Sequence, residues 1–302
     1  MTQILVSGLI NLETTLRVDG FPIVYQPVHY PFFGVRSTVS GVGYNVSKAL
    51  TTLGDSVRFV SLIGRGAVGE MVRAALATDG ISGEYVLQNL THTAQSVILY
   101  DQNGRRQIHV DLKDIQEQVY PAAMFQQALD LCAWAVLCNI NFSRPFLTLA
   151  QERGVPIATD VHTIARLDDE YNRDFMQAAR VLFMSDEALP STPEEWARQV
   201  VNRYGNEIVV IGLGMRGVLL SVKSDGFLER IPAVRTRPVV NTIGAGDALF
   251  SAFVHFYAQT ADPYMAIRKA VLFSSYKIGE TGAADGFLGE AELNRLTVQL
   301  EN

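Results

Sequence analysis

The residues most suited to chemistry lie at positions 241–248, which read Asn-Thr-Ile-Gly-Ala-Gly-Asp-Ala and open an apolar helical pattern. Small residues before a helix leave backbone N–H groups free to bind an anion, and the helix dipole assists them. Asp247 in that first turn is suited to act as a general base that takes a proton from a hydroxyl attacking a bound phosphate. A helix N-terminal charge, stabilising the helix by roughly 0.3–1 kcal/mol, is the alternative.

A second glycine-rich segment at residues 40–45 reads Ser-Gly-Val-Gly-Tyr-Asn and leads into another expected helix. The closely spaced Gly41 and Gly43 allow a ligand to approach the backbone, and Asn45 offers a donor and an acceptor to a hydroxyl group. The same residues are also typical of a turn and a helix cap. Taken alone, this segment therefore favours the structural interpretation.

Two segments match the pattern G-x-G-x-x-G, at residues 64–69 and 212–217. The second, with Gly212, Gly214 and Gly217, precedes a strand-like run, whereas a dinucleotide fingerprint requires a helix there. We expect this segment to join two strands. The first has the strand and helix that the fingerprint needs, but no acidic residue ends the next strand at the expected distance. Nicotinamide binding is thus a weaker alternative.

Other familiar motifs are missing from the chain. It contains no P-loop, no G-x-S-x-G elbow and no H-E-x-x-H motif. The five histidines are scattered, and His162, at an expected strand end, is interpreted as a loop cap. Cys132 and Cys138 lie within an apolar run without further cysteines or histidines at ligand spacing, so we expect buried, reduced side chains rather than a zinc site or a disulfide.

The elements that must position these residues alternate along the chain. We expect strands at residues 4–9, 57–63, 134–138, 155–159, 180–184 and 207–211. We expect helices at residues 45–53, 70–77, 145–153, 193–204, 247–259, 263–278 and 289–300. Strands that alternate with amphipathic helices predict an α/β fold with a mostly parallel sheet that is covered by helices on both faces.

Two segments depart from this alternation. Residues 17–38 carry prolines and aromatic residues, and residues 95–110 have the pattern of a β-hairpin around Asp101-Gln102-Asn103-Gly104. We expect the two segments to form a small antiparallel sheet over one edge of the main sheet. Such a sheet is suited to be a lid, an oligomer contact, or both.

The composition bounds the function. The 302 residues include 31 acidic and 25 basic side chains, for a net charge of -6, and 48% of the residues are hydrophobic. This composition predicts a globular protein, and the acidic balance argues against nucleic-acid and membrane partners. The first residues do not resemble a signal peptide, and no run approaches the roughly 18 apolar residues of a membrane span. We expect a cytoplasmic protein.

Taken together, these motifs resemble the ribokinase family, also called the PfkB carbohydrate kinases, over nearly the whole chain. The two family signatures correspond to residues 41–45 and 241–247, in the family's order. The resemblance implies a ribokinase-like three-layer α/β fold in one domain over residues 1–302. It also implies a β lid from about residues 12–38 and 88–113.

The resemblance further implies an ATP-dependent kinase that transfers the γ-phosphate to a hydroxymethyl group of a small sugar. By the family pattern, Asp247 is the base, and the N–H groups of Gly244, Ala245 and Gly246 form the anion hole. The positions that match sugar-binding residues are Asn11, Glu13, Gly41, Gly43 and Asn45. Those that match the nucleotide-side loop are Gly212, Gly214 and Gly217.

The chain departs from the family pattern in places. Glu13 replaces the usual aspartate. The family's N-x-x-E element, associated with Mg²⁺, corresponds to residues 185–188, where Ala188 stands at the glutamate position and Glu187 is the candidate metal ligand. Asn241 and Ile243 stand at positions that help to hold a monovalent cation in potassium-activated members, so a requirement for K⁺ does not carry over.

Three alternatives remain open. A nucleoside kinase of the same fold, adenosine- or pseudouridine-like, would stack the base on Tyr44, Phe32 or Phe33. A non-catalytic sugar or nucleotide sensor would explain the altered N-x-x-E element, and the dehydrogenase interpretation predicts NAD binding. The family pattern also suggests a homodimer formed through the lid.

Overall fold

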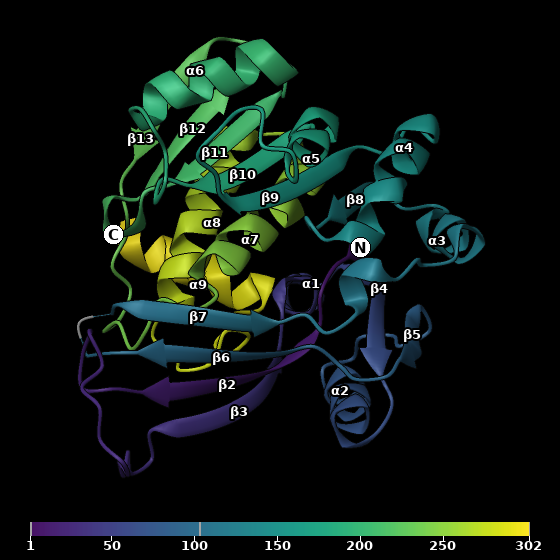
Figure 1. Cartoon of the computed structure of the whole chain (residues 1–302). Helices are drawn as coiled ribbons and strands as arrows, with labels where there is room; N and C mark the ends of the chain where they lie inside the picture. The colour runs from purple at the N-terminus through teal and green to yellow at the C-terminus, as the bar shows by residue number, and fades with distance from the viewer. Residues whose placement is uncertain (1, 103, 302) are drawn as a thin grey trace.

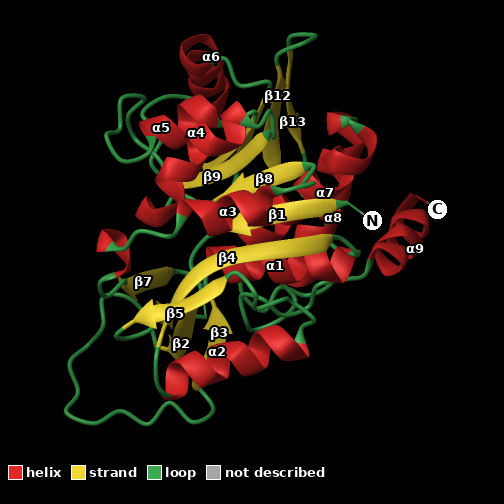
Figure 2. Ribbon diagram, turned by 90° about the vertical axis from the view of Figure 1, so that its right-hand side faces the viewer, coloured by secondary structure: helices red, strands yellow, loops and turns green. Residues whose placement is uncertain are grey.

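A nine-stranded sheet forms the centre of the computed structural model, which describes residues 2–102 and 104–301 (Figures 1 and 2). Its order is β13-β12-β11-β10-β9-β8-β1-β4-β5, parallel from β5 to β11 and antiparallel beyond. The strands are β1 Gln3–Ser7, β4 Ser56–Gly64, β5 Val86–Leu90, β8 Trp134–Leu137, β9 Ile157–Thr163, β10 Val181–Ser185, β11 Ile208–Gly212, β12 Val218–Val222 and β13 Phe227–Ile231. All six expected strands belong to this sheet, which confirms the α/β prediction.

Helices cover both faces of the sheet, as Figure 2 shows. One core cluster joins the sheet to α1 Val42–Leu53, α2 Ala67–Thr78, α7 Ala245–Thr260, α8 Pro263–Lys277 and α9 Glu290–Glu301. The other joins it to α3 Ala122–Leu129, α4 Arg144–Glu152, α5 Arg173–Ala178 and α6 Pro193–Tyr204. Short 3₁₀ helices occur at η1 Ile115–Glu117, η2 Asn141–Ser143 and η3 Gly214–Arg216. The expected three-layer architecture is confirmed.

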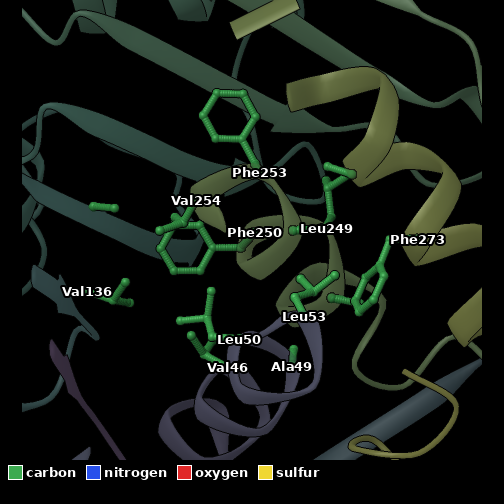
Figure 3. Packing of buried hydrophobic residues seen from close by; sticks show 14 of the residues in the cluster. Val46, Ala49, Leu50, Leu53, Val136, Leu249, Phe250, Phe253, Val254 and Phe273 are labelled. Atoms are coloured by element: carbon green, nitrogen blue, oxygen red, sulfur yellow. The ribbon is translucent and has the colours of Figure 1, made fainter. Parts of the chain in front are cut away.

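Helices α1 and α7 pack against each other through apolar side chains (Figure 3). The apolar residues of α1 recur at helical spacing and contact the buried face of α7. From α1 these are Val46, Ala49, Leu50 and Leu53, and from α7 they are Leu249, Phe250, Phe253 and Val254. Because each motif precedes or opens one of these helices, their packing brings the motifs together.

The second sheet has four strands in the order β3-β2-β6-β7 and lies beside the main sheet (Figure 1). Its strands are β2 Asn11–Arg17, β3 Val35–Ser40, β6 Gln95–Tyr100 and β7 Arg106–Asp111. The prediction of a wholly antiparallel sheet is wrong, because β2 and β6 pair in parallel. β2 follows β1 and β6 follows β5 along the chain. Because β1 and β5 run in the same direction in the main sheet, β2 and β6 enter the small sheet in the same direction.

Cys132 and Cys138 are buried and are not joined by a disulfide. Burial raises the pKa of the Cys138 thiol, so this side chain behaves as a small core residue. None of the helices in the described ranges is long and apolar enough to cross a membrane.

Candidate active site

The N-terminus of α7 has the geometry of an anion site. Gly244 caps the helix with φ 75°, and a Cβ at this position would clash with the carbonyl oxygen of Ala283. The Ala245 N–H donates to the Thr242 carbonyl oxygen at 3.2 Å. The N–H groups that follow in the first turn lack intrahelical acceptors, as in any helix. Glycine therefore keeps a tight turn that presents backbone donors to a ligand.

Asp247 lies in this first turn, where its carboxylate is held by α1. Its Oδ2 accepts a hydrogen bond from Asn45 Nδ2 at 2.7 Å. Burial raises the pKa of Asp247, an effect that the Asn45 hydrogen bond and the nearby His162 and Lys277 oppose. The structure thus joins the two motifs in one site, with a partly desolvated carboxylate at a helix N-terminus.

A cluster of buried polar side chains from the small sheet continues from Asn45. The Ser40 hydroxyl is within hydrogen-bond distance of Glu13 Oε2 at 3.1 Å and of Asn45 Oδ1 at 3.3 Å. Asn11 Nδ2 donates to Ser96 Oγ at 3.1 Å. Asn11 Oδ1 and Glu13 Oε1 are buried without a hydrogen-bond partner in the described structure.

Two buried acceptors without partners are costly unless a ligand supplies donors. Burial is the main cause that raises the pKa of Glu13, and the charge of Asp247 adds to it, whereas the Ser40 hydrogen bond and Lys277 oppose the rise. Hydroxyl groups of a polyol would donate to these oxygens. The cluster therefore fits an acceptor substrate that carries several hydroxyls.

The two glycines of the first motif have a backbone role. Gly43 lies so close to the turn after β1 that a Cβ would come within 2.5 Å of the Gly8 carbonyl carbon. Gly41 caps α1 with φ 105°. Both glycines allow α1 to begin against that turn, which sets the position of Asn45.

The third group of glycines lies at the end of β11, as expected for a connection between strands. Gly214 begins η3 and Gly217 follows its last residue, and the Leu213 N–H donates to the Gly217 carbonyl oxygen at 2.9 Å. β12 follows and pairs antiparallel with β11, which confirms that a strand rather than a helix follows this segment. The Asp186 N–H donates to the Gly212 carbonyl oxygen at 3.0 Å, so the segment adjoins the Glu187 loop.

Glu187 has a largely exposed carboxylate just after β10, and its Oε1 lies 3.6 Å from Arg106 of β7. No group of three or more His, Cys, Asp or Glu residues suited to a metal occurs in the described ranges. Mg²⁺ commonly uses one or two carboxylates together with substrate phosphates. A single accessible carboxylate therefore fits a metal that arrives with a nucleotide.

The sequence interpretation missed three basic residues at this site. Arg36 of β3 bonds to Thr281 and to Asp285, and Arg106 of β7 donates to Thr242 Oγ1 at 2.8 Å. Lys277, at the end of α8, bonds to the Ile243 carbonyl oxygen. Ile98 of the small sheet also packs against Ile243 and Ala283. The signal for Lys277 was a lone lysine among apolar residues of an expected helix.

His162, interpreted as a loop cap, lies near Asp247. Its N–H donates to Asp160 Oδ1 at 2.8 Å, its φ is 57°, and its imidazole is among the groups that lower the pKa of Asp247. Backbone strain of this kind tends to occur at functional sites.

Tyr44, a candidate for stacking on a nucleobase, is buried and bonds to Asp79, so it does not offer its ring to a nucleobase.

Comparison with known proteins gives a consistent result. The family model for the pfkB family carbohydrate kinases matches residues 1–288. An ATP-dependent ribose-1-phosphate kinase of Halopiger xanaduensis is 25% identical over 289 residues, 94% of each chain. The microbiome-derived acarbose kinase Mak1 has a TM-score of 0.87 at 24% identity, covering 98% of this chain and 99% of its own.

A Burkholderia thailandensis nucleoside kinase in complex with inosine has a TM-score of 0.80 at 20% identity, covering 99% of this chain and 98% of its own. At these identities the structural likenesses support the fold, and the family model supports the activity. Together they confirm the ribokinase-like fold that the two motifs predicted. The chain belongs to the pfkB family of carbohydrate kinases and is a phosphotransferase.

Proposed function

We propose that the chain transfers the γ-phosphate of ATP to a hydroxymethyl group of a small sugar, with Asp247 as the general base. The position of Asp247 carries the proposal. Its carboxylate lies at the N-terminus of α7, bonded to Asn45 at 2.7 Å and adjoining the polar cluster that holds Glu13. A carboxylate placed there can take the proton of an acceptor hydroxyl while the helix N-terminus binds the phosphoryl group.

In this mechanism backbone N–H groups provide most of the electrostatic stabilisation of the phosphoryl group. The N–H groups of Gly244, Ala245 and Gly246 stabilise the negative charge of the transferring phosphoryl group. Burial raises the pKa of Asp247, which makes it a stronger base than an exposed aspartate. The acceptor is oriented by Asn11, Glu13 and Asn45, with Gly41 and Gly43 beside it.

The loops next to the acceptor site would contact the nucleotide and the metal ion. Gly212, Gly214 and Gly217 would line the nucleotide, and Glu187 would hold Mg²⁺, which would neutralise part of the phosphate charge. The side chain of Ile243 has no oxygen to offer a cation, so we propose that activity does not require K⁺.

ATP turnover across a panel of acceptors tests this proposal. The panel contains pentoses, hexoses, ribose 1-phosphate, acarbose and nucleosides, with Mg²⁺ present. Turnover that depends on a sugar supports the proposal and identifies the acceptor. Turnover only with nucleosides supports the nucleoside kinase alternative, for which Phe32 and Phe33 remain candidates because both rings are exposed. Binding without turnover of any acceptor supports a sensor and contradicts the proposal.

Glu13→Ala is expected to raise the KM of the acceptor by about 10- to 150-fold, because hydrogen bonds to a charged group contribute about 1.5–3 kcal/mol. Thr14→Ala is the matched control, since Thr14 is the next residue on β2 and bonds to Ser37 on the exposed side. Steady-state kinetics at varied acceptor concentration measure both variants. An unchanged KM in Glu13→Ala would remove Glu13 from the acceptor site.

We propose that the four-stranded sheet is a lid and a dimer contact. Arg36, Arg106 and Ile98 link it to the segments around the base, as a lid that excludes water requires. Its exposed apolar residues, and those of the loop before β3, offer a surface for a second copy of the chain, because exposed apolar patches commonly mark protein–protein contacts. They include Ile23, Val24, Tyr25, Val28, Phe32, Phe33, Val35 and Val97. Light scattering should give a mass near twice 33.2 kDa.

A further inference from the structure

Lys277 is a fully buried lysine to which the proposed reaction assigns no role. Its ammonium group donates to the main-chain oxygen of Ile243, the residue that precedes Gly244. Among the described residues it forms no ion pair. Lysine is almost never fully buried unless it is paired, because desolvating the charge is costly. This position therefore requires an explanation beyond packing.

The environment of Lys277 is acidic on several sides. The carboxylates that act on it belong to Asp247 of α7, Glu13 of β2, and Asp285 and Glu280 of the segment after α8. Asp285 bonds to Arg36 and Glu280 bonds to Arg237. Asp247 and Glu13 have no arginine partner in the part of the chain that the structure describes. For these two groups, Lys277 is a nearby source of positive charge.

Lys277 also belongs to a seam that joins the end of α8 to the loop before α7. The N–H groups of Val240 and Asn241 donate to the Ile278 carbonyl oxygen at 2.9 Å and 3.3 Å. Asn241 Nδ2 donates to the Thr281 carbonyl oxygen at 2.6 Å. Lys277 is the charged member of this seam, and it bonds at the position nearest to the backbone donors of α7.

We propose that Lys277 is a positioning residue for phosphoryl transfer. Its ammonium group holds the Ile243 carbonyl oxygen in place, and this fixes the backbone N–H donors that follow Ile243. It also places a positive charge next to these donors. A misplaced group near the reacting atoms reduces the rate strongly, so a loop held in this way favours catalysis. The inference rests on the proposed function, because it concerns the loop that would bind the phosphoryl group.

The charge state of Lys277 gives the proposal a pH signature. Burial lowers the pKa of Lys277 from 10.5 to about 8, and the surrounding carboxylates limit the fall. Because the ammonium form is required, kcat should fall as the pH rises through about 8. Folding stability should change in the opposite direction. Between about pH 8 and 10.5 the unfolded chain binds more protons at Lys277 than the folded chain does. The contribution of Lys277 to the free energy of unfolding therefore rises with pH in this range.

The first experiment compares Lys277→Met with Lys269→Met, which removes an ammonium group from the same helix but at its contact with α9. We expect Lys277→Met to lower kcat by about 10²-fold with little change in either KM. Its melting temperature should be retained or raised, since an apolar side chain replaces a buried charge. Lys269→Met should leave kcat unchanged. Equal kcat values for Lys277→Met and the unmodified enzyme would overturn the proposal.

The second experiment uses Lys277→Ala, which leaves space for a small cation. Methylammonium should raise the kcat of Lys277→Ala by at least about tenfold, whereas sodium at equal ionic strength should not. If neither variant folds, the unmodified enzyme still tests the proposal, because kcat that stays constant from pH 7 to pH 10 contradicts it. A lack of turnover in the unmodified enzyme with every acceptor would instead contradict the proposed function. The melting temperature difference between Lys277→Met and the unmodified protein, followed from pH 7 to pH 10, tests the charge independently of activity.

Discussion

Asp247→Asn is expected to lower kcat by about 10²- to 10⁴-fold while ATP and the acceptor still bind, because general-base catalysis contributes about this much. The asparagine keeps the shape of the side chain and can still accept the hydrogen bond from Asn45. Since burial raises the pKa of Asp247, its charge is costly in the folded state. Asp247→Asn should therefore melt at the same or a higher temperature than the unmodified protein.

The pH profile of the unmodified enzyme adds a second readout. A base acts in its deprotonated form, so kcat/KM should be lost as the pH falls through the raised pKa of Asp247. Asp262→Asn is the matched control, because Asp262 caps α8 and accepts from the N–H groups of Tyr264 and Met265. Asparagine also caps helices, so we expect Asp262→Asn to lose only the roughly 0.3–1 kcal/mol of a helix N-terminal charge, with no effect on kcat. Similar behaviour of the two variants would reduce Asp247 to a helix N-terminal charge.

Gly244→Ala is expected to lower kcat by about 10²-fold or more, the effect of losing an anion-hole donor. Two features of the structure argue for this result. The residue has φ 75°, and an added Cβ would clash with the Ala283 carbonyl oxygen, so the loop must shift. Stopped-flow or steady-state measurements of ATP turnover would give kcat for the variant.

Gly226→Ala separates the two causes of the Gly244 effect. Gly226 has φ 74° but nothing within 4 Å of an added Cβ, and it lies in the turn between β12 and β13. Gly226→Ala should lose only the stability that the strained backbone costs, about 1–2 kcal/mol, and its kcat should be unchanged. If Gly244→Ala loses stability to the same extent but keeps its kcat, the N-terminus of α7 does not bind the phosphoryl group.

The sequence by itself determined the α/β class and the elements that carry the motifs. Buried parallel strands such as β4 and β10 are short apolar runs, and helices such as α6 begin at clear signals, here Thr192 followed by Pro193. The strand after Gly217 was also evident, since local residue patterns distinguish it from a helix. These features depend on residues that are close together in the chain.

The tertiary structure decided the features that depend on distant pairs. The parallel pairing of β2 with β6 follows from the directions of β1 and β5, which no local pattern records. Likewise, Lys277 reaches Ile243 only because α8 returns beside α7, and Tyr44 turns to Asp79 rather than to the site. A sequence motif predicts which groups can react. Long-range packing decides which charges surround them, and therefore how readily Asp247 accepts a proton.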